Sequence, residues 1–201
     1  QSLVNALADE NAYVCRAAGE ALTHIGEPAL HALQMALASD QSKMRASAAR
    51  CIGLLGTKAM TAVPALTQTL ADRDICVRRA AVAALGKLVG PAAVRALGQA
   101  LADKDGGVRL EAINKLFEAG EHAAIVLPAL RTALSDRIPA VVMIAAKTVA
   151  QLGPLAEQAI PCLGELLASD AIEIRMGAVK ALRKLGKLSA PTVPALEKSL
   201  R

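Results

Sequence analysis

The sequence repeats a short pattern at a nearly constant interval, and this feature constrains the fold more than any other. A leucine is followed seven residues later by another apolar residue, as in Leu70 and Val77. The anchoring leucines are Leu7, Leu37, Leu70, Leu101, Leu134, Leu167 and Leu200, separated by 30, 33, 31, 33, 33 and 33 residues. Such a period is typical of repeat architectures, in which each repeat packs only on its neighbours.

Each repeat contains two amphipathic segments of helical spacing. In repeat three, Val63, Leu66 and Leu70 form one apolar stripe, and Val77 begins a second one. Pro64 suits the first turn of the first segment, which we expect to run from about 59 to 71. A glycine closes every repeat, where we expect left-handed caps at Gly26, Gly56, Gly90, Gly120, Gly153 and Gly186.

These patterns predict an all-α fold of twelve to thirteen helices in antiparallel pairs, without strands. The predicted domain is a single array over 1–201, with repeats at approximately 1–26, 27–56, 57–90, 91–120, 121–153 and 154–186 and a partial repeat at 187–201. The chain begins inside a repeat without an initiator methionine, which leaves open that it is a fragment of a longer chain.

Composition agrees with closely packed helices. Of the 201 residues, 44 are alanine, and the aromatic residues are one tyrosine and one phenylalanine. Alanine and leucine favour helices, and a sheet protein would need more β-branched and aromatic residues. The longest apolar run, about 140–146, is far shorter than the roughly 20 residues of a membrane-spanning helix. No signal-peptide pattern opens the sequence.

No motif for catalysis, metal or cofactor binding is present. The four cysteines have no paired spacing, and the three histidines are isolated from one another. We therefore expect no enzyme, no metal and no cofactor, and we expect buried thiols in a reducing, cytoplasmic compartment. The net charge of +5 favours an acidic partner without identifying it.

Two columns of the repeat carry structural information. The residue four after Val77 and its counterparts is always alanine, at Ala18, Ala48, Ala81, Ala112, Ala145 and Ala178, which indicates a close helix approach. The residue directly after Val77 is arginine in four repeats, at Arg45, Arg78, Arg109 and Arg175. Because aspartates precede them in each loop, we predict a structural ladder in which these arginines bind loop carbonyls or an adjacent aspartate. Ligand binding by the arginines is the alternative.

The motif Asp-x-x-x-Val-Arg-x-x-Ala-x-x-x-Leu-Gly, followed by a helix with Pro-Ala-Leu, resembles the HEAT repeat. It is most similar to the short HEAT-like repeats of phycobilin lyase subunits and bacterial scaffolds. The resemblance implies a right-handed α-α superhelix whose second helices line the concave side, and it implies binding without naming a partner. Repeat five departs from the motif, with Val142 in place of arginine and Ile138-Pro139-Ala140 in the loop.

The inner face of the second helices is the predicted partner-binding site. Positions pointing away from the apolar stripe hold eight basic residues against Glu20 and Glu118. The candidate partner-binding residues are Arg16, Arg50, Arg79, Leu110, Phe117, Met143, Lys147, Met176, Lys180 and Arg183. Basic and apolar residues together predict a protein scaffold that binds an acidic, partly apolar segment.

Three other functions compete with the scaffold hypothesis. The chain could be a structural module of a larger protein, with its contacts elsewhere. The basic face could instead bind a nucleic-acid backbone, although stacking aromatics are nearly absent. A chromophore chaperone of the phycobilin-lyase kind is disfavoured, because Phe117 is the only aromatic candidate on the inner face. The sequence predicts no oligomeric state.

Overall fold

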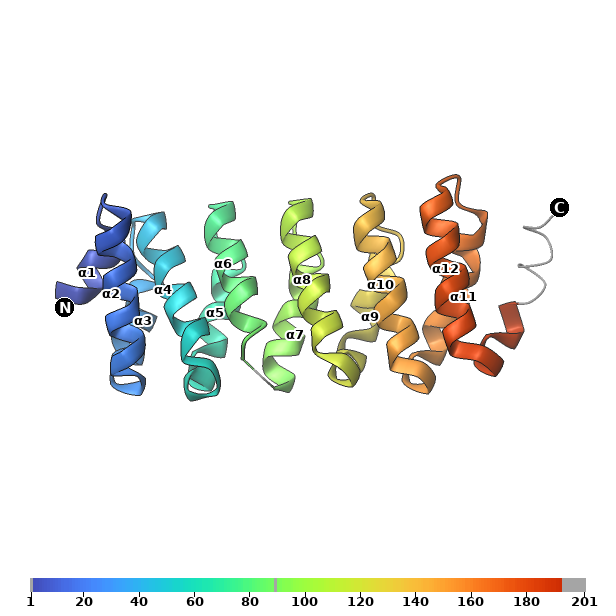
Figure 1. The fold of residues 1–201 in the computed structure, drawn as a ribbon, viewed down its shortest axis with the longest axis horizontal. Coiled ribbons are helices and arrows are strands. Elements are labelled where there is room, and N and C mark those ends of the chain that lie inside the picture. The colour runs from blue at the N-terminus through green and yellow to red at the C-terminus, as the bar shows by residue number, and fades with distance from the viewer. Residues whose placement is uncertain (1, 89, 193–201) are drawn as a thin grey trace. The chain divides into compact units, whose positions relative to one another are not determined.

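The computed structural model describes residues 2–88 and 90–192, and all of its regular elements there are helical. They form two compact bodies, Gln1–Ala100 and Leu101–Arg201, which we call the N-terminal body and the C-terminal body. The predicted helix pairs without strands are thus confirmed for the described residues (Figure 1). That the repeats form one domain stays a prediction.

In the N-terminal body, the longer second helices lie side by side in the order α2, α4, α6 (Figure 1). The helices of this body are α1 (Ser2–Asn5), α2 (Ala12–Ile25), α3 (Leu30–Ala36), α4 (Ser42–Leu55), α5 (Val63–Thr69), α6 (Ile75–Leu85) and α7 (Pro91–Ala100). Short 3₁₀ segments at Ala6–Ala8, Glu27–Ala29 and Gly56–Ala62 precede or extend the first helices.

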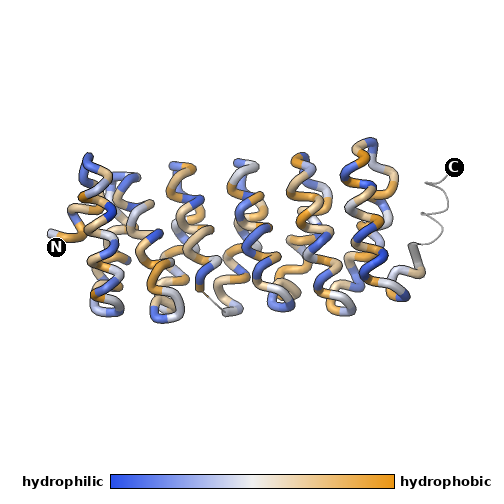
Figure 2. The backbone as a smooth tube through the Cα atoms, viewed as in Figure 1, coloured by the Kyte–Doolittle hydropathy of each residue, from blue (hydrophilic) through white to orange (hydrophobic). Residues whose placement is uncertain are grey.

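In the C-terminal body, α10 packs between α8 and α12. Its helices are α8 (Gly106–Glu118), α9 (Leu127–Ala133), α10 (Pro139–Leu152), α11 (Ile160–Glu165) and α12 (Ile172–Leu185), with 3₁₀ segments at Gly120–Val126, Gly153–Ala159, Leu166–Ala168 and Gly186–Thr192. Figure 2 shows apolar and polar residues interspersed along these helices, as expected when each helix buries only part of its surface.

The first helices are shorter than the sequence predicted. The first helix of repeat three begins at Val63 rather than near Ala59, and Pro64 lies at its N-terminus. The preceding Gly56–Ala62 is a 3₁₀ segment with a non-helical residue at Ala59. Proline lacks an N–H and fixes φ, so it suits a first helical turn and separates the two segments. Pro128 and Pro161 occupy the same place in α9 and α11, and Pro194 lies outside the described residues.

The terminal glycines have positive φ as predicted, but the conformation is not that of a left-handed helical cap at Gly26, Gly56, Gly153 and Gly186. Gly56 has φ 59° and ψ −137°, and Gly153 has φ 57° and ψ −126°. These values lie in the mirror image of the β region, which only glycine visits readily. The chain therefore turns sharply from the second helix of one repeat into the first helix of the next.

The alanine column is buried as predicted, with Ala48, Ala81, Ala112, Ala145 and Ala178 all fully inaccessible to solvent. A close approach also occurs at Gly53, where an added Cβ would lie 2.7 Å from the Cα of Ala84 in α6. Small residues therefore permit the tight packing of α4 on α6.

One stretch of the described chain, Pro139–Ala168, is long enough and apolar enough to cross a membrane, judged by its length and composition alone. Half of its most apolar window is buried in the protein, and the turn at Gly153 divides it into α10 and a 3₁₀ segment that leads into α11. Both features are those of a core segment.

Candidate functional site: the arginine ladder and the basic faces

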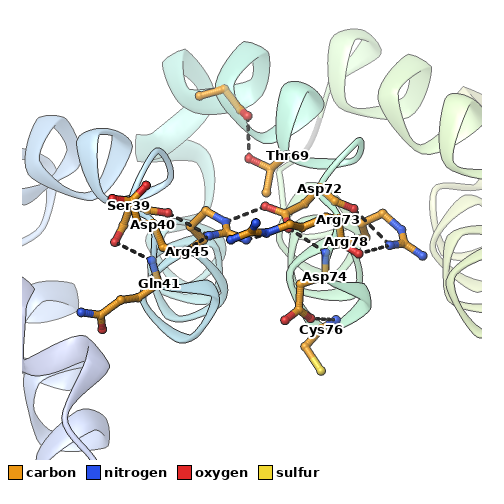
Figure 3. A network of polar contacts seen from close by, with 11 residues as sticks. Ser39, Asp40, Gln41, Arg45, Thr69, Asp72, Arg73, Asp74, Cys76 and Arg78 are labelled. Atoms are coloured by element: carbon orange, nitrogen blue, oxygen red, sulfur yellow. Dashed lines mark hydrogen bonds and ion pairs between the residues drawn. The ribbon is translucent and has the colours of Figure 1, made fainter.

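Arg45, in the first turn of α4, joins two consecutive loops of the N-terminal body (Figure 3). Its Nε and Nη2 donate to the two carboxylate oxygens of Asp72, at 2.6 and 2.8 Å. Its Nη1 donates to the backbone carbonyls of Ser39 and Asp40, at 2.8 and 3.0 Å. The guanidinium thus binds its own loop through carbonyls and the next loop through a bidentate ion pair.

Arg109 makes the same contacts in the C-terminal body. Its Nε and Nη2 donate to Asp136 at 2.5 and 2.8 Å, and its Nη1 donates to the carbonyl of Asp103 at 2.9 Å. In both pairs the aspartate follows the arginine by 27 residues. The two arginines are almost completely buried, and their contacts have the geometry that a structural ladder would have.

Each ladder aspartate also shapes its own loop. Asp72 accepts the backbone N–H of Asp74 at 2.8 Å, and Asp136 accepts that of Ile138 at 2.9 Å. Asp74 in turn caps α6 by accepting the N–H of Cys76. The hydrogen bonds from Arg45 and Arg109 lower the pKa values of Asp72 and Asp136, and the aspartates raise the pKa values of the arginines. Both members of each pair therefore stay charged at neutral pH.

The loop aspartate changes together with the arginine of the preceding repeat. Where Cys15 and Val142 replace the arginine, the next loop has Ser39 and Ser169 in the aspartate position. A buried carboxylate without a guanidinium would be costly, and serine avoids that cost. The remaining ladder arginines, Arg78 and Arg175, both bind carbonyls of their own loops.

The candidate partner-binding residues of the C-terminal body lie on α8, α10 and α12, and we call this surface the C-terminal basic face. It comprises Leu110, Phe117, Met143, Lys147, Met176, Lys180 and Arg183. Lys147, Lys180 and Arg183 are exposed, as are Phe117 and Met176, whereas Leu110 and Met143 are half-buried. Met143 packs beside Gly177, where an added Cβ would lie 3.6 Å from its Cγ. The expected methionine row is thus exposed on α12 and partly covered on α10.

The charges of this face are unevenly satisfied. Glu118 is engaged by Lys115, whose Nζ lies 2.8 Å from its Oε2. Within the described residues, Lys147, Lys180 and Arg183 have neither an ion pair nor a hydrogen bond from the side chain. The face therefore presents net positive charge beside apolar side chains.

The other three candidates, Arg16, Arg50 and Arg79, are exposed on α2, α4 and α6 of the N-terminal body. Arg16 is paired with Glu20 at 3.8 Å and lies 5.3 Å from the ring centre of Tyr13. Sequence reasoning did not single out a hollow of about 230 Å³ on this side, lined by Arg50, Gly53, Leu54, Ala83, Ala84 and Lys87. The sequence pattern that could have predicted this hollow is the occurrence of small residues in consecutive repeats, next to the exposed Leu54.

The described part of the chain gives no support for metal binding or thiol chemistry. No cluster of three histidine, cysteine or acidic residues that could hold a metal ion occurs there. The four cysteines are free thiols, and burial raises the pKa of Cys51 to about 11, which disfavours the reactive thiolate.

Comparisons with known proteins agree on the fold. A similar structure is the complex of CpcE and CpcF of phycocyanin lyase from Nostoc sp. PCC7120, with 19% identity over 98% of this chain and 93% of that chain, and a TM-score of 0.57. A designed armadillo repeat protein in complex with the peptide (KR)4 has 18% identity over 92% and 98% of the two chains, and a TM-score of 0.62. An engineered protein has 22% identity over 93% and 96%, with a TM-score of 0.59.

No curated protein matches the sequence. The family model described as HEAT repeats matches residues 33–116 and 94–183, which together cover most of the chain. These matches and the stacked helix pairs confirm the helical repeat solenoid of the armadillo and HEAT kind. Such a scaffold mediates protein binding and is typically not catalytic. The chain belongs to the HEAT repeat family.

Proposed function

We propose that this HEAT repeat chain is a non-enzymatic scaffold that binds an acidic, partly apolar segment of a partner protein on the C-terminal basic face. The observation that carries the proposal is the set of three exposed cations, Lys147, Lys180 and Arg183, which have no partner among the described residues and lie next to the exposed Met176. Unpaired surface charge beside apolar area is typical of a surface that becomes covered in a complex.

The geometry of stacked helices fits an extended or helical ligand. Met143 and Met176 occupy one column of the repeat, and Lys147 and Lys180 occupy another, one helical turn further on. Adjacent packed helices lie about 8–10 Å apart, so each column forms a row that a peptide can follow. Methionine side chains adapt to apolar ligands, while the cations orient acidic residues.

A designed armadillo repeat protein of similar fold was solved with the basic peptide (KR)4, so a repeat scaffold of this kind can hold a peptide. On the C-terminal basic face of the present chain, the charges without a partner among the described residues are positive, which favours a peptide of the opposite sign. Because its four thiols are free, we also propose a reducing, cytoplasmic setting.

The test uses two labelled probes, an eight-residue peptide alternating glutamate and leucine and the peptide (KR)4, with binding measured by fluorescence anisotropy. The acidic peptide should bind and (KR)4 should not. Met143→Ser with Met176→Ser should weaken binding of the acidic peptide by about tenfold, because it removes apolar contact area. Leu155→Ser is a matched control, since Leu155 is an exposed apolar residue outside the basic face.

A single-stranded oligonucleotide distinguishes nucleic-acid binding. The oligonucleotide could bind with a steep salt dependence, and the double methionine variant could leave its affinity unchanged. In that case the basic face binds nucleic-acid phosphates instead of a peptide. Lys147→Glu with Lys180→Glu should weaken both kinds of ligand and therefore only locates the face. Unchanged peptide affinity in the methionine variant contradicts the proposal.

A further inference from the structure

The hollow of about 230 Å³ between α4 and α6, which we call the α4–α6 hollow, has an exposed leucine in its wall. It lies at an interior junction, because α4 also packs on α2, and α6 also packs on α7. Leu54 lines the hollow and is 56% exposed. The other complete repeats hold a polar residue at the position of Leu54: His24, Lys87, Glu118, Gln151 and Lys184. Packing between repeats therefore does not require a leucine there.

The α4–α6 hollow is open because a side chain is missing at Ala83. This inner-face position holds a longer polar residue in the other complete repeats: Glu20, Arg50, Asn114, Lys147 and Lys180. Gly53, which also lines the hollow, is explained by packing, since its added Cβ would lie 2.7 Å from the Cα of Ala84. Ala83 is only half-buried and has no such close neighbour to avoid. Helix packing thus accounts for Gly53 but not for Ala83.

Two cations stand at the rim of the hollow, one from each helix. Arg50 lies on α4, Lys87 follows the end of α6, and both are exposed. Within the described residues, Arg50 makes one long hydrogen bond, from Nη2 to Oγ of Ser47 at 3.4 Å, and Lys87 has neither an ion pair nor a side-chain hydrogen bond. None of the six described residues that line the hollow is acidic. Charge complementarity therefore favours an occupant with an apolar group for the floor and negative charges for the rim.

The size of the hollow favours a single side chain as the buried group. Sites for drug-sized molecules have volumes of about 300–1,000 Å³, and the α4–α6 hollow is smaller. Nucleic-acid bases bind by stacking on aromatic side chains, and none of the described lining residues is aromatic. A large apolar side chain in a small pocket, surrounded by polar contacts, is typical of the centre of a protein interface.

We propose that the α4–α6 hollow binds an acidic segment of a partner protein, which inserts one large apolar side chain against Leu54 and Ala83. Carboxylates next to that side chain pair with Arg50 and Lys87. This is a second binding site, in the N-terminal body, and it does not depend on the C-terminal basic face.

A tryptophan peptide tests the proposal, because the chain itself contains no tryptophan. The fluorescence of the probe Asp-Glu-Trp-Glu-Asp therefore reports the burial of its indole directly. The titration uses the full chain with Met143→Ser and Met176→Ser, which weakens the C-terminal basic face without changing the net charge. Binding should shift the emission to shorter wavelength, and the competitor Asp-Glu-Ala-Glu-Asp should bind about 30-fold more weakly than the probe.

The variant Ala83→Leu fills the hollow and leaves the charge unchanged, so in the same background it should weaken binding of the probe by about 30-fold. Ala71→Leu is the matched control, because Ala71 is an exposed alanine of the same body outside the hollow, and it should bind as the background does. Circular dichroism checks that both variants retain their helices. Equal affinity of the two variants overturns the proposal.

The rim charge is tested separately. Lys87→Glu should weaken the probe by about tenfold, whereas Arg95→Glu makes the same charge change at an exposed position of α7 outside the hollow and should have no effect. If indole-3-acetate binds as tightly as the probe, the hollow takes a small carboxylic acid and the peptide assignment is wrong. A probe that binds the wild type but loses its emission shift in the methionine background lies on the C-terminal basic face, which overturns this inference and leaves the proposed function intact.

Discussion

The pair of Arg45 and Asp72 provides the sharpest test of how consecutive repeats hold together. Their side chains are only 8% and 11% exposed and are joined by two short hydrogen bonds. Asp72→Ala leaves the buried guanidinium without its counter-charge and removes the acceptor for the N–H of Asp74. Loss of one partner of a buried ion pair costs about 3–5 kcal/mol, and we expect a destabilisation of this size.

The free energy of unfolding from urea denaturation, followed by circular dichroism, measures this effect. Asp40→Ala is the matched control, because Asp40 offers Arg45 only its backbone carbonyl. It should change the free energy of unfolding by less than about 0.5 kcal/mol. Hydrogen exchange then shows whether the loss is confined to α4 and α6, as nearest-neighbour coupling requires.

The difference in stability between the wild type and Asp72→Ala should depend on pH, because the pKa of Asp72 is lowered in the folded chain. An aspartate in the unfolded chain has a pKa of about 3.9, so the ion pair stabilises the fold fully above that pH. Its contribution is lost as the pH falls through the lower pKa of the folded state. The gap in stability between wild type and Asp72→Ala should therefore persist at neutral pH and close in acid.

A double-mutant cycle decides whether the pair itself is responsible. Arg45→Met with Asp72→Ala should show a coupling energy of about 1–3 kcal/mol relative to the single variants. Additive effects would refute the reasoning, because they would mean that each side chain acts only through its own loop.

Further predictions concern the packing between helices. Ala81→Leu should lower the free energy of unfolding by about 1–3 kcal/mol through overpacking, whereas Ala83→Leu, which faces the hollow, should be nearly neutral, as denaturation of both variants would show. Gly53→Ala should also be destabilising, because its methyl group would lie 2.7 Å from the backbone of α6. The methyl group of Gly177→Ala would meet only ordinary van der Waals contacts, and the change should stabilise α12 by about 0.5–1 kcal/mol. A loss in thermal stability would show that the methyl group does not fit there. Amide exchange should be faster around 138–146 than at the start of α6, because Val142 cannot make the arginine contacts; equal protection would remove this prediction.

The repeat fold could be predicted well from the sequence, because every repeat independently shows the same spacing of apolar residues. Six alanines in one column predicted the close packing of helices there. The arginine column predicted bonds to loop carbonyls or to an adjacent aspartate, and Arg45 and Arg109 make both. The segment before α5 was misassigned as helix, because the apolar spacing of a 3₁₀ segment and of an α-helix is similar over so few residues. The conformation at Gly56 was also missed, since a positive φ does not determine ψ.

The binding surface was less predictable than the fold. Met143 and Met176 stand in the same column, yet neighbouring packing leaves them with different exposure. The hollow next to Leu54 depends on the absence of side-chain volume in two helices together, which no single repeat displays.

The matched change of arginine and loop aspartate limits how such a chain can be rearranged. A duplicated repeat five would place a second copy of Asp136 in the repeat that follows Val142, so the new carboxylate would enter a junction that contains Ser169 in the present chain. A duplicated repeat three would instead meet an arginine and an aspartate that fit each other. A segment of this protein can therefore be exchanged when its first repeat contains the loop carboxylate and its last repeat contains the ladder arginine. Insertions or deletions that break this match create a buried charge at the new join.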